Sequence, residues 1–130
     1  NQTADALVKA ATSSASPAIK AVAWDVKAKI AVAAEEWNVA GQSIERSLST
    51  LSRTDSPCAA WKIHDTASAY HQHSGDLEKA EQHRSESQDA ILAMVRSFPV
   101  GHPLRNSLLA EEPIRKILGD EASSRYLHAE

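Results

Sequence analysis

Apolar residues recur every three or four positions along most of the chain, which is the spacing that gives a helix one apolar face. The first such stripe follows residue 16 and predicts a helix over residues 17–34. Ser16-Pro17 and Ser56-Pro57 each place a capping hydroxyl before a proline at the first helical position, where its missing N–H costs nothing. The stripe consists of Ile19, Val22, Ala23, Val26, Ile30 and Ala33.

The remaining stripes predict further helices separated by short breaks. A turn at residues 35–38 precedes a second helix that ends near residue 53, and a third helix from Pro57 stops at Gly75, which suits a left-handed C-cap. A fourth helix spans residues 76–97, and prolines divide the last apolar stretch into short helices near 103–110 and 113–118. Residues 120–130 are weakly patterned and are assigned to a tail. The predicted fold class is all-α, because an alanine-rich chain with 5% aromatic residues suits packed helices better than sheets.

Several residue types recur 40 positions apart, which indicates an internal repeat. Paired helices at this interval predict an α-α superhelix, or solenoid, of about two and a half repeats. The repeats lie near residues 16–53 and 56–97 of a domain spanning 1–119, and Leu7, Val8 and Ala11 place the chain's start inside the second helix of a preceding repeat. The matched pairs are Ser16-Pro17 with Ser56-Pro57, Asp25 with Asp65, Ala40 with Ala80, Gln42 with Gln82, and Ser47 with Ser87.

On these residues the chain resembles the tetratricopeptide-repeat (TPR) family. Trp24 stands early in a first helix, Gly75-Asp76 gives the tight turn before a second helix, and Ala40 and Ala80 are the small residues at which paired helices touch. Residues 97–118 resemble the closing segment of such repeats in bacterial regulatory ATPases, including cyclase-linked and transcription-activator types. The resemblance implies a right-handed superhelix with a terminal capping helix.

The chain also departs from the family pattern. Its unit is longer than the usual length of about 34 residues. His71 replaces an aromatic or apolar residue late in the first helix, and Arg84 stands where a large apolar residue is usual. These departures concern the packing of the second repeat.

Charge and composition exclude several functional classes. A net charge of −3 without a cluster of lysine and arginine argues against a nucleic-acid surface. No apolar run approaches the about 20 residues of a membrane helix, so no membrane association is expected. The single cysteine, Cys58, excludes an internal disulfide and is expected to be a small buried thiol in a reducing compartment, which predicts a cytoplasmic protein.

No catalytic constellation is recognisable. The chain contains neither a GxSxG nucleophile motif nor a glycine-rich phosphate loop, so it is not expected to be an enzyme. The histidines lack the HxxxH spacing that zinc favours on one helix, and they are interpreted as structural or solvated, with no metal or cofactor expected. They are His64, His71, His73, His83, His102 and His128.

In a solenoid of this type the first helices of successive repeats line one face, which is used to hold a protein or peptide. The resemblance therefore implies a non-catalytic protein–protein interaction module, the C-terminal part of a larger bacterial regulatory or signalling protein. Two alternatives stay open: a free-standing helical bundle that binds a small molecule or metal, and a self-association domain that pairs through its N-terminal repeat edge. Trp37 either covers the core or contacts a partner. Carried over by position from the resemblance, the predicted partner-binding residues are Asp25, Lys29, Lys62, Asp65, Ala69, Gln72 and His73.

Overall fold

The computed structural model describes residues 2, 5–6, 9 and 16–129, and all regular structure in these residues is helical. The all-α prediction is therefore confirmed. Leu7, Val8 and Ala11 lie outside the described residues. None of the helices in the described part of the chain combines the length and the apolar character that a membrane crossing requires. The helices are α2 (Pro17–Ala33), α3 (Trp37–Leu51), α4 (Pro57–Ser74), α5 (Leu77–Arg96), α6 (Pro103–Ala110), α7 (Glu112–Leu118) and α8 (Asp120–His128).

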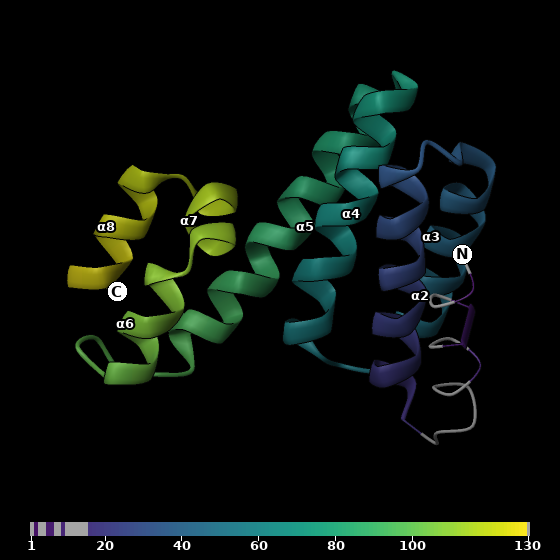
Figure 1. The fold of residues 1–130 in the computed structure, drawn as a ribbon. Coiled ribbons are helices and arrows are strands. Elements are labelled where there is room, and N and C mark those ends of the chain that lie inside the picture. Colours follow the sequence, from purple (N-terminus) through teal and green to yellow (C-terminus); the bar gives the residue numbers. More distant parts are fainter. Residues whose placement is uncertain (1, 3–4, 7–8, 10–15, 130) are drawn as a thin grey trace.

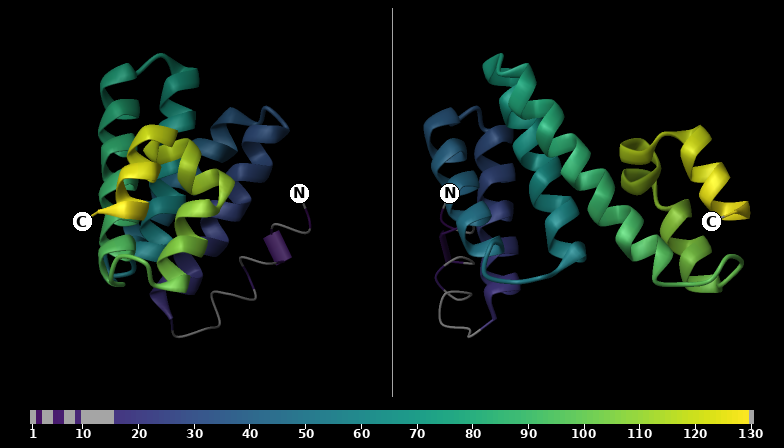
Figure 2. Two further views of the ribbon diagram at one scale, coloured as in Figure 1. Left: turned by 90° about the vertical axis from the view of Figure 1, so that its left-hand side faces the viewer. Right: turned by 180° about the vertical axis from the view of Figure 1, so that it is seen from behind.

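The first four of these helices form two neighbouring hairpins (Figure 1). Helix α2 packs along α3, α4 packs along α5, and α4 also contacts both helices of the first hairpin. Seen from behind, α3 and α5 lie on the near side of α2 and α4 (Figure 2). Helix α5 extends past α4, and its far end supports α6 and α7.

Both hairpins begin and turn with the same local chemistry. The hydroxyls of Ser16 and Ser56 accept hydrogen bonds from the backbone N–H groups three residues later, at 3.4 and 3.3 Å, and a proline follows each serine. The turn inside each hairpin contains a left-handed residue, Glu35 with φ +58° and Gly75 with φ +86°. Because each feature recurs 40 residues later, the two hairpins start and reverse at equivalent positions.

A buried serine also joins the two helices of each hairpin. Ser47 on α3 donates a hydrogen bond to the carbonyl oxygen of Ala21 at 2.7 Å, and Ser87 on α5 donates one to that of Trp61 at 2.8 Å. Donors and acceptors are both separated by 40 residues, so the second helix meets the first in the same register in both hairpins.

Small side chains bring the helices close together. Ala21, Ala28, Ala40 and Ala67 are fully buried, which explains why an alanine-rich sequence builds this core. Gly41 serves the same purpose, since the Tyr70 hydroxyl lies 2.6 Å from the place where a Cβ atom would stand. A side chain at residue 41 would therefore displace the Tyr70 ring.

Residues 120–128 form α8, where the sequence pattern suggested a tail. Tyr126 is buried in the same core as Ile114. The buried side chain of Arg105 donates hydrogen bonds to the carbonyl oxygens of Tyr126, at 2.7 and 3.1 Å, and of Ala129, at 3.1 Å. Helix α8 is thus held by Tyr126, by the partly buried Ala122 and Leu127, and by the distant Arg105.

Candidate functional site

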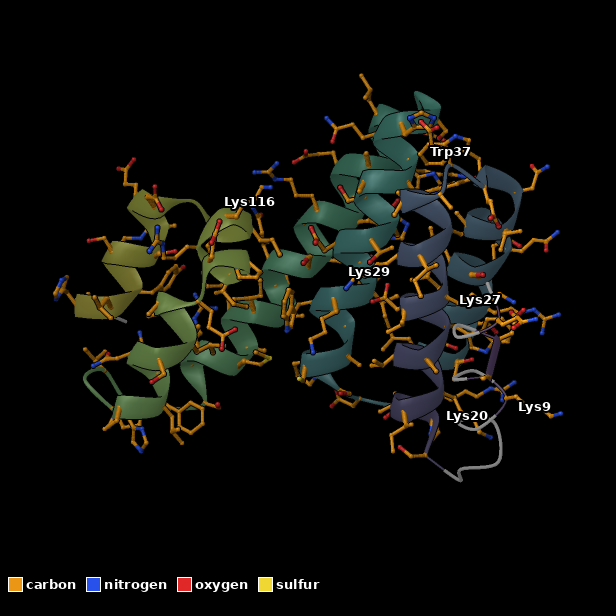
Figure 3. All side chains as sticks on the ribbon, in the orientation of Figure 1. Lys9, Lys20, Lys27, Lys29, Trp37 and Lys116 are labelled. Carbon is orange, nitrogen blue, oxygen red and sulfur yellow. The ribbon has the colours of Figure 1, made fainter. Side chains whose placement is uncertain are left out.

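A groove of about 610 Å³ lies between α4 and α7, with α5 at its base. Most of its wall residues are exposed, whereas Ser87 and Ile117 at the bottom are buried. Figure 3 shows Lys116 on α7, across from α4. Helix α4 contributes Asp65, Ser68, Ala69 and Gln72, α5 contributes Arg84 and Ser87, and α7 contributes Glu112, Pro113, Lys116 and Ile117.

The equivalent surface of the first hairpin is covered by the second hairpin. Asp25, Ala28 and Ile44 are only 2%, 0% and 4% exposed. Ala28 and Ile44 pack together with Ala67 of α4. This surface of the first hairpin therefore receives a helix of the same chain.

One period later the same positions hold Asp65, Ser68 and Arg84, and they line the groove. Helix α7 packs on α5. Alanine and isoleucine, which pack under α4 in the first hairpin, are replaced here by serine and arginine. The groove therefore corresponds to the surface on which α4 packs in the first hairpin, but it carries polar side chains at two of the matching positions.

The polar side chains on the groove walls are not paired with one another. Among the described residues, the side chains of Asp65, Gln72, Arg84, Glu112 and Lys116 make no hydrogen bond and no ion pair within 4.0 Å. The two serines differ, since their hydroxyls bond to backbone carbonyl groups. The wall residues therefore present unpaired charges and an amide to whatever enters the groove.

Asp65 is the acidic centre of this surface. Although its side chain reaches solvent, the surrounding protein raises the pKa of its carboxyl group by desolvation. The positive charges of Lys29, Lys116 and Arg84 partly offset this and lower the pKa. The Asp65 carboxylate thus lies in the field of three cations, one each from α2, α7 and α5.

The structure brings together three of the predicted partner-binding residues, Asp65, Ala69 and Gln72, in one groove. The prediction for Asp25 is wrong, because α4 covers it and leaves the residue 2% exposed. Burial raises the pKa of Asp25, and its Oδ1 atom has no hydrogen-bond partner. Its Oδ2 atom lies 3.2 Å from the half-exposed Lys29, which therefore belongs to an ion pair at the edge of the α2–α4 interface.

Lys62 and His73 lie away from the groove. The ammonium group of Lys62 sits 5.7 Å from the ring centre of Trp61, and the residue borders a separate hollow that also includes Cys58. Cys58 is exposed, so the expectation of a buried thiol is wrong. The His73 ring stacks on Trp37 with centroids 3.6 Å apart, which makes Trp37 a half-buried contact between the hairpins (Figure 3).

A second cluster of polar side chains spans the α4–α5 hairpin. His64 on α4 meets His83 and Glu86 on α5, with ring nitrogen and carboxylate oxygen atoms converging. Ligand spacing within single helices does not predict this group, because its members come from two helices. The available signal was the His83-x-x-Glu86 spacing, which places both side chains on one face of α5.

Two features of the described residues therefore bear on function: the groove between α4 and α7, and the cluster of His64, His83 and Glu86. The groove contains predicted contact residues, and the cluster contains none. Comparisons of the chain with models of known protein families, with curated proteins and with solved structures find no match.

Proposed function

We propose that the chain is a non-catalytic protein-interaction module that binds a polar peptide segment of a partner protein in the groove between α4 and α7. We also propose that its two hairpins are successive units of a tetratricopeptide-like superhelix. The observation that carries the binding proposal is the set of unpaired polar side chains on the groove walls. They are Asp65, Gln72, Arg84, Glu112 and Lys116.

The superhelix is supported by the features that recur 40 residues apart. The serine caps, the left-handed turn residues and the buried serine hydrogen bonds all occur at equivalent places in the two hairpins. Repeat units of this kind stack because each unit presents a surface that receives the next. The first unit receives α4, and the second presents its equivalent surface to solvent.

A polypeptide is the ligand that best suits such a surface. In the first hairpin this surface already packs against a helix of the same chain, so its shape is complementary to protein. In the second hairpin, Ser68 and Arg84 replace apolar residues and make the surface compatible with water. A surface of this composition suits a partner that binds and leaves, because non-obligate interfaces are more polar than permanent ones.

The charges on the walls indicate what the segment carries. Asp65 on α4 and Glu112 on α7 offer carboxylates, while Arg84 on α5 and Lys116 on α7 offer cations. Mixed charge of this kind gives orientation and specificity, because a like charge placed opposite another costs binding free energy. We therefore expect a segment with both acidic and basic side chains.

The test is a peptide selection followed by affinity measurement. Peptides selected from a random display library on the wild-type chain are titrated, by isothermal calorimetry, into the wild type and into an Asp65→Asn/Arg84→Gln double variant. Asp65→Asn keeps the side-chain size, Arg84→Gln shortens the side chain, and together they remove one groove charge of each sign. We expect an affinity loss of roughly tenfold or more, or about 1.4 kcal/mol, because each removed charge leaves a peptide charge unpaired.

The matched control is a Glu45→Gln/Arg53→Gln double variant, which removes one charge of each sign from exposed positions outside the groove. This control should bind the selected peptides as the wild type does. Equal affinity for all three proteins would show that the peptides bind elsewhere and would contradict the proposal.

A further inference from the structure

Three potential metal-ligand atoms converge between α4 and α5. The Nδ1 atom of His64 lies 2.9 Å from Nδ1 of His83 and 3.0 Å from Oε2 of Glu86. Nδ1 of His83 lies 3.6 Å from the same carboxylate oxygen. The two histidine side chains are 16% and 15% exposed, so the cluster is mostly shielded and opens to solvent on the side of Glu86.

Protons alone satisfy this arrangement poorly. A neutral imidazole Nδ1 either donates or accepts, and a carboxylate only accepts. If His83 donates to His64, the lone pair of His64 faces the Glu86 oxygen at 3.0 Å; if both histidines carry a proton on Nδ1, the two protons meet. If only His64 carries a proton on Nδ1, that proton is divided between two acceptors, and if neither histidine does, only lone pairs face one another. A cation at the centre resolves the conflict, since it accepts a lone pair from each atom.

The distances match those around a bound metal ion. Zinc binds histidine nitrogen and carboxylate oxygen at about 2.0–2.2 Å, which places neighbouring ligand atoms about 3.0 Å apart at right angles and about 3.4 Å apart at the tetrahedral angle. The separations of 2.9, 3.0 and 3.6 Å cover this range. The circle through the three atoms has a radius of about 1.9 Å, so a point about 2.1 Å from all of them lies just above their plane.

The ligand set selects the class of metal. Two imidazole nitrogens with one carboxylate oxygen suit zinc and other late first-row dications, whereas magnesium and calcium prefer oxygen ligands alone. We propose that His64, His83 and Glu86 form a binding site for Zn²⁺ or a similar first-row transition-metal dication.

The surroundings of the site bear on what the metal does. The His71 ring lies parallel to that of His83, with centroids 5.4 Å apart and planes 5° apart, and this restricts how the ligand ring can turn. His64 also borders a hollow of about 490 Å³ between α3, α4 and α5. Three protein ligands leave a coordination position for water or for a donor atom of a bound molecule. Because the ligands come from both helices, the metal also links α4 to α5.

The test uses the untagged chain, freed of metal with a chelator and then titrated with ZnCl₂ by isothermal calorimetry. We expect one tight site per chain. We also expect a melting temperature roughly 5–10 °C higher when Zn²⁺ is at about a hundredfold excess over its dissociation constant. Magnesium at the same concentration should leave the melting temperature unchanged. Cobalt should give visible d–d absorption bands at one equivalent.

The variants identify the ligands. His64→Ala, His83→Ala and Glu86→Gln should each weaken Zn²⁺ binding by at least roughly tenfold. The control His128→Ala removes an exposed histidine on α8 and should bind as the wild type does. Glu86→Gln decides the question if a histidine variant fails to fold, because the Glu86 side chain is 44% exposed and the substitution keeps its shape. The proposal is overturned if the wild type binds no Zn²⁺, or if the ligand variants bind it as tightly as the wild type.

Discussion

Glu35 and Gly75 occupy the same position in the two hairpins, but only one of them is a glycine. Both have positive φ angles, at +58° and +86°. A side chain in this region clashes with its own backbone and costs about 1–2 kcal/mol, from which glycine is free. The first hairpin therefore turns on a strained residue, and the second does not.

Glu35→Gly should stabilise the chain by about 0.5–1 kcal/mol, because relief of the strain exceeds the entropy that glycine adds to the unfolded state. Gly75→Ala should destabilise it by about 1 kcal/mol, since nothing lies within 4 Å of the new Cβ atom and only the backbone is affected. Urea unfolding measures both changes. A loss of stability in Glu35→Gly would mean that the Glu35 side chain makes a favourable interaction that exceeds the strain.

Asp25 is a second residue whose position lowers the free energy of unfolding, because its carboxylate is buried. Its burial raises the pKa above the unfolded value of 3.8, against the lowering effects of Thr66 and Lys29, and the negative charge of Asp65 adds to the rise. The folded chain therefore holds this proton more tightly than the unfolded chain. The stability that the group contributes is complete below its unfolded pKa and is lost as the pH rises through its folded-state pKa.

Asp25→Asn should therefore stabilise the chain at pH 7, by roughly 1 kcal/mol, and the difference from the wild type should vanish as the pH falls below about 4. Thermal unfolding across this pH range measures it. Glu45→Gln controls for the loss of one negative charge at an exposed position. A variant less stable than the wild type at pH 7 would show that the ion pair with Lys29 outweighs the cost of burial.

At the scale of the helices, the buried serines test whether the hairpins are equivalent. Ser47→Ala and Ser87→Ala should each destabilise the chain by about 1 kcal/mol, the usual net contribution of one hydrogen bond. The two losses should add within about 0.5 kcal/mol, because the sites share no partner. Urea unfolding of the single and double variants measures this, with the exposed Ser49→Ala as control. A cost at only one of the two positions would contradict equivalent registers.

Helix boundaries could be predicted because the chemistry that sets them is local. Ser16-Pro17 and Ser56-Pro57 act on N–H groups three residues away, and Gly75 acts through its own φ angle. The docking of α8 could not be predicted, since it depends on Arg105 reaching carbonyl groups 21 and 24 residues later. The sequence around either residue does not indicate such a contact.

The same distinction between local and distant contacts applies to the candidate sites. The 40-residue period matched Asp25 with Asp65, yet it could not predict that one is buried and the other exposed, because exposure depends on whether another hairpin follows. The histidine cluster was hidden for a related reason. His64 and His83 are 19 residues apart in the chain and meet only through the α4–α5 register.

At the scale of the whole molecule, equivalent surfaces of the two hairpins differ in what covers them and in their polarity. The first is covered by α4 and is apolar around Ala28 and Ile44, while the second is open and polar around Ser68 and Arg84. Helices α6 and α7 pack at the far end of α5, and α7 forms the opposite wall of the groove. The zinc site proposed above shares no residue with this groove, so binding at the two sites can be measured separately.

The most direct test of the binding groove is an NMR titration of the ¹⁵N-labelled chain with a peptide selected on the wild type. Amide shift changes report where the peptide lies without any substitution. We predict the largest changes at the residues that line the groove, which fall between residues 65 and 72 of α4, 84 and 87 of α5 and 112 and 117 of α7. Changes confined to other surfaces, such as the hollow around Ile19 and Cys58, would contradict the account.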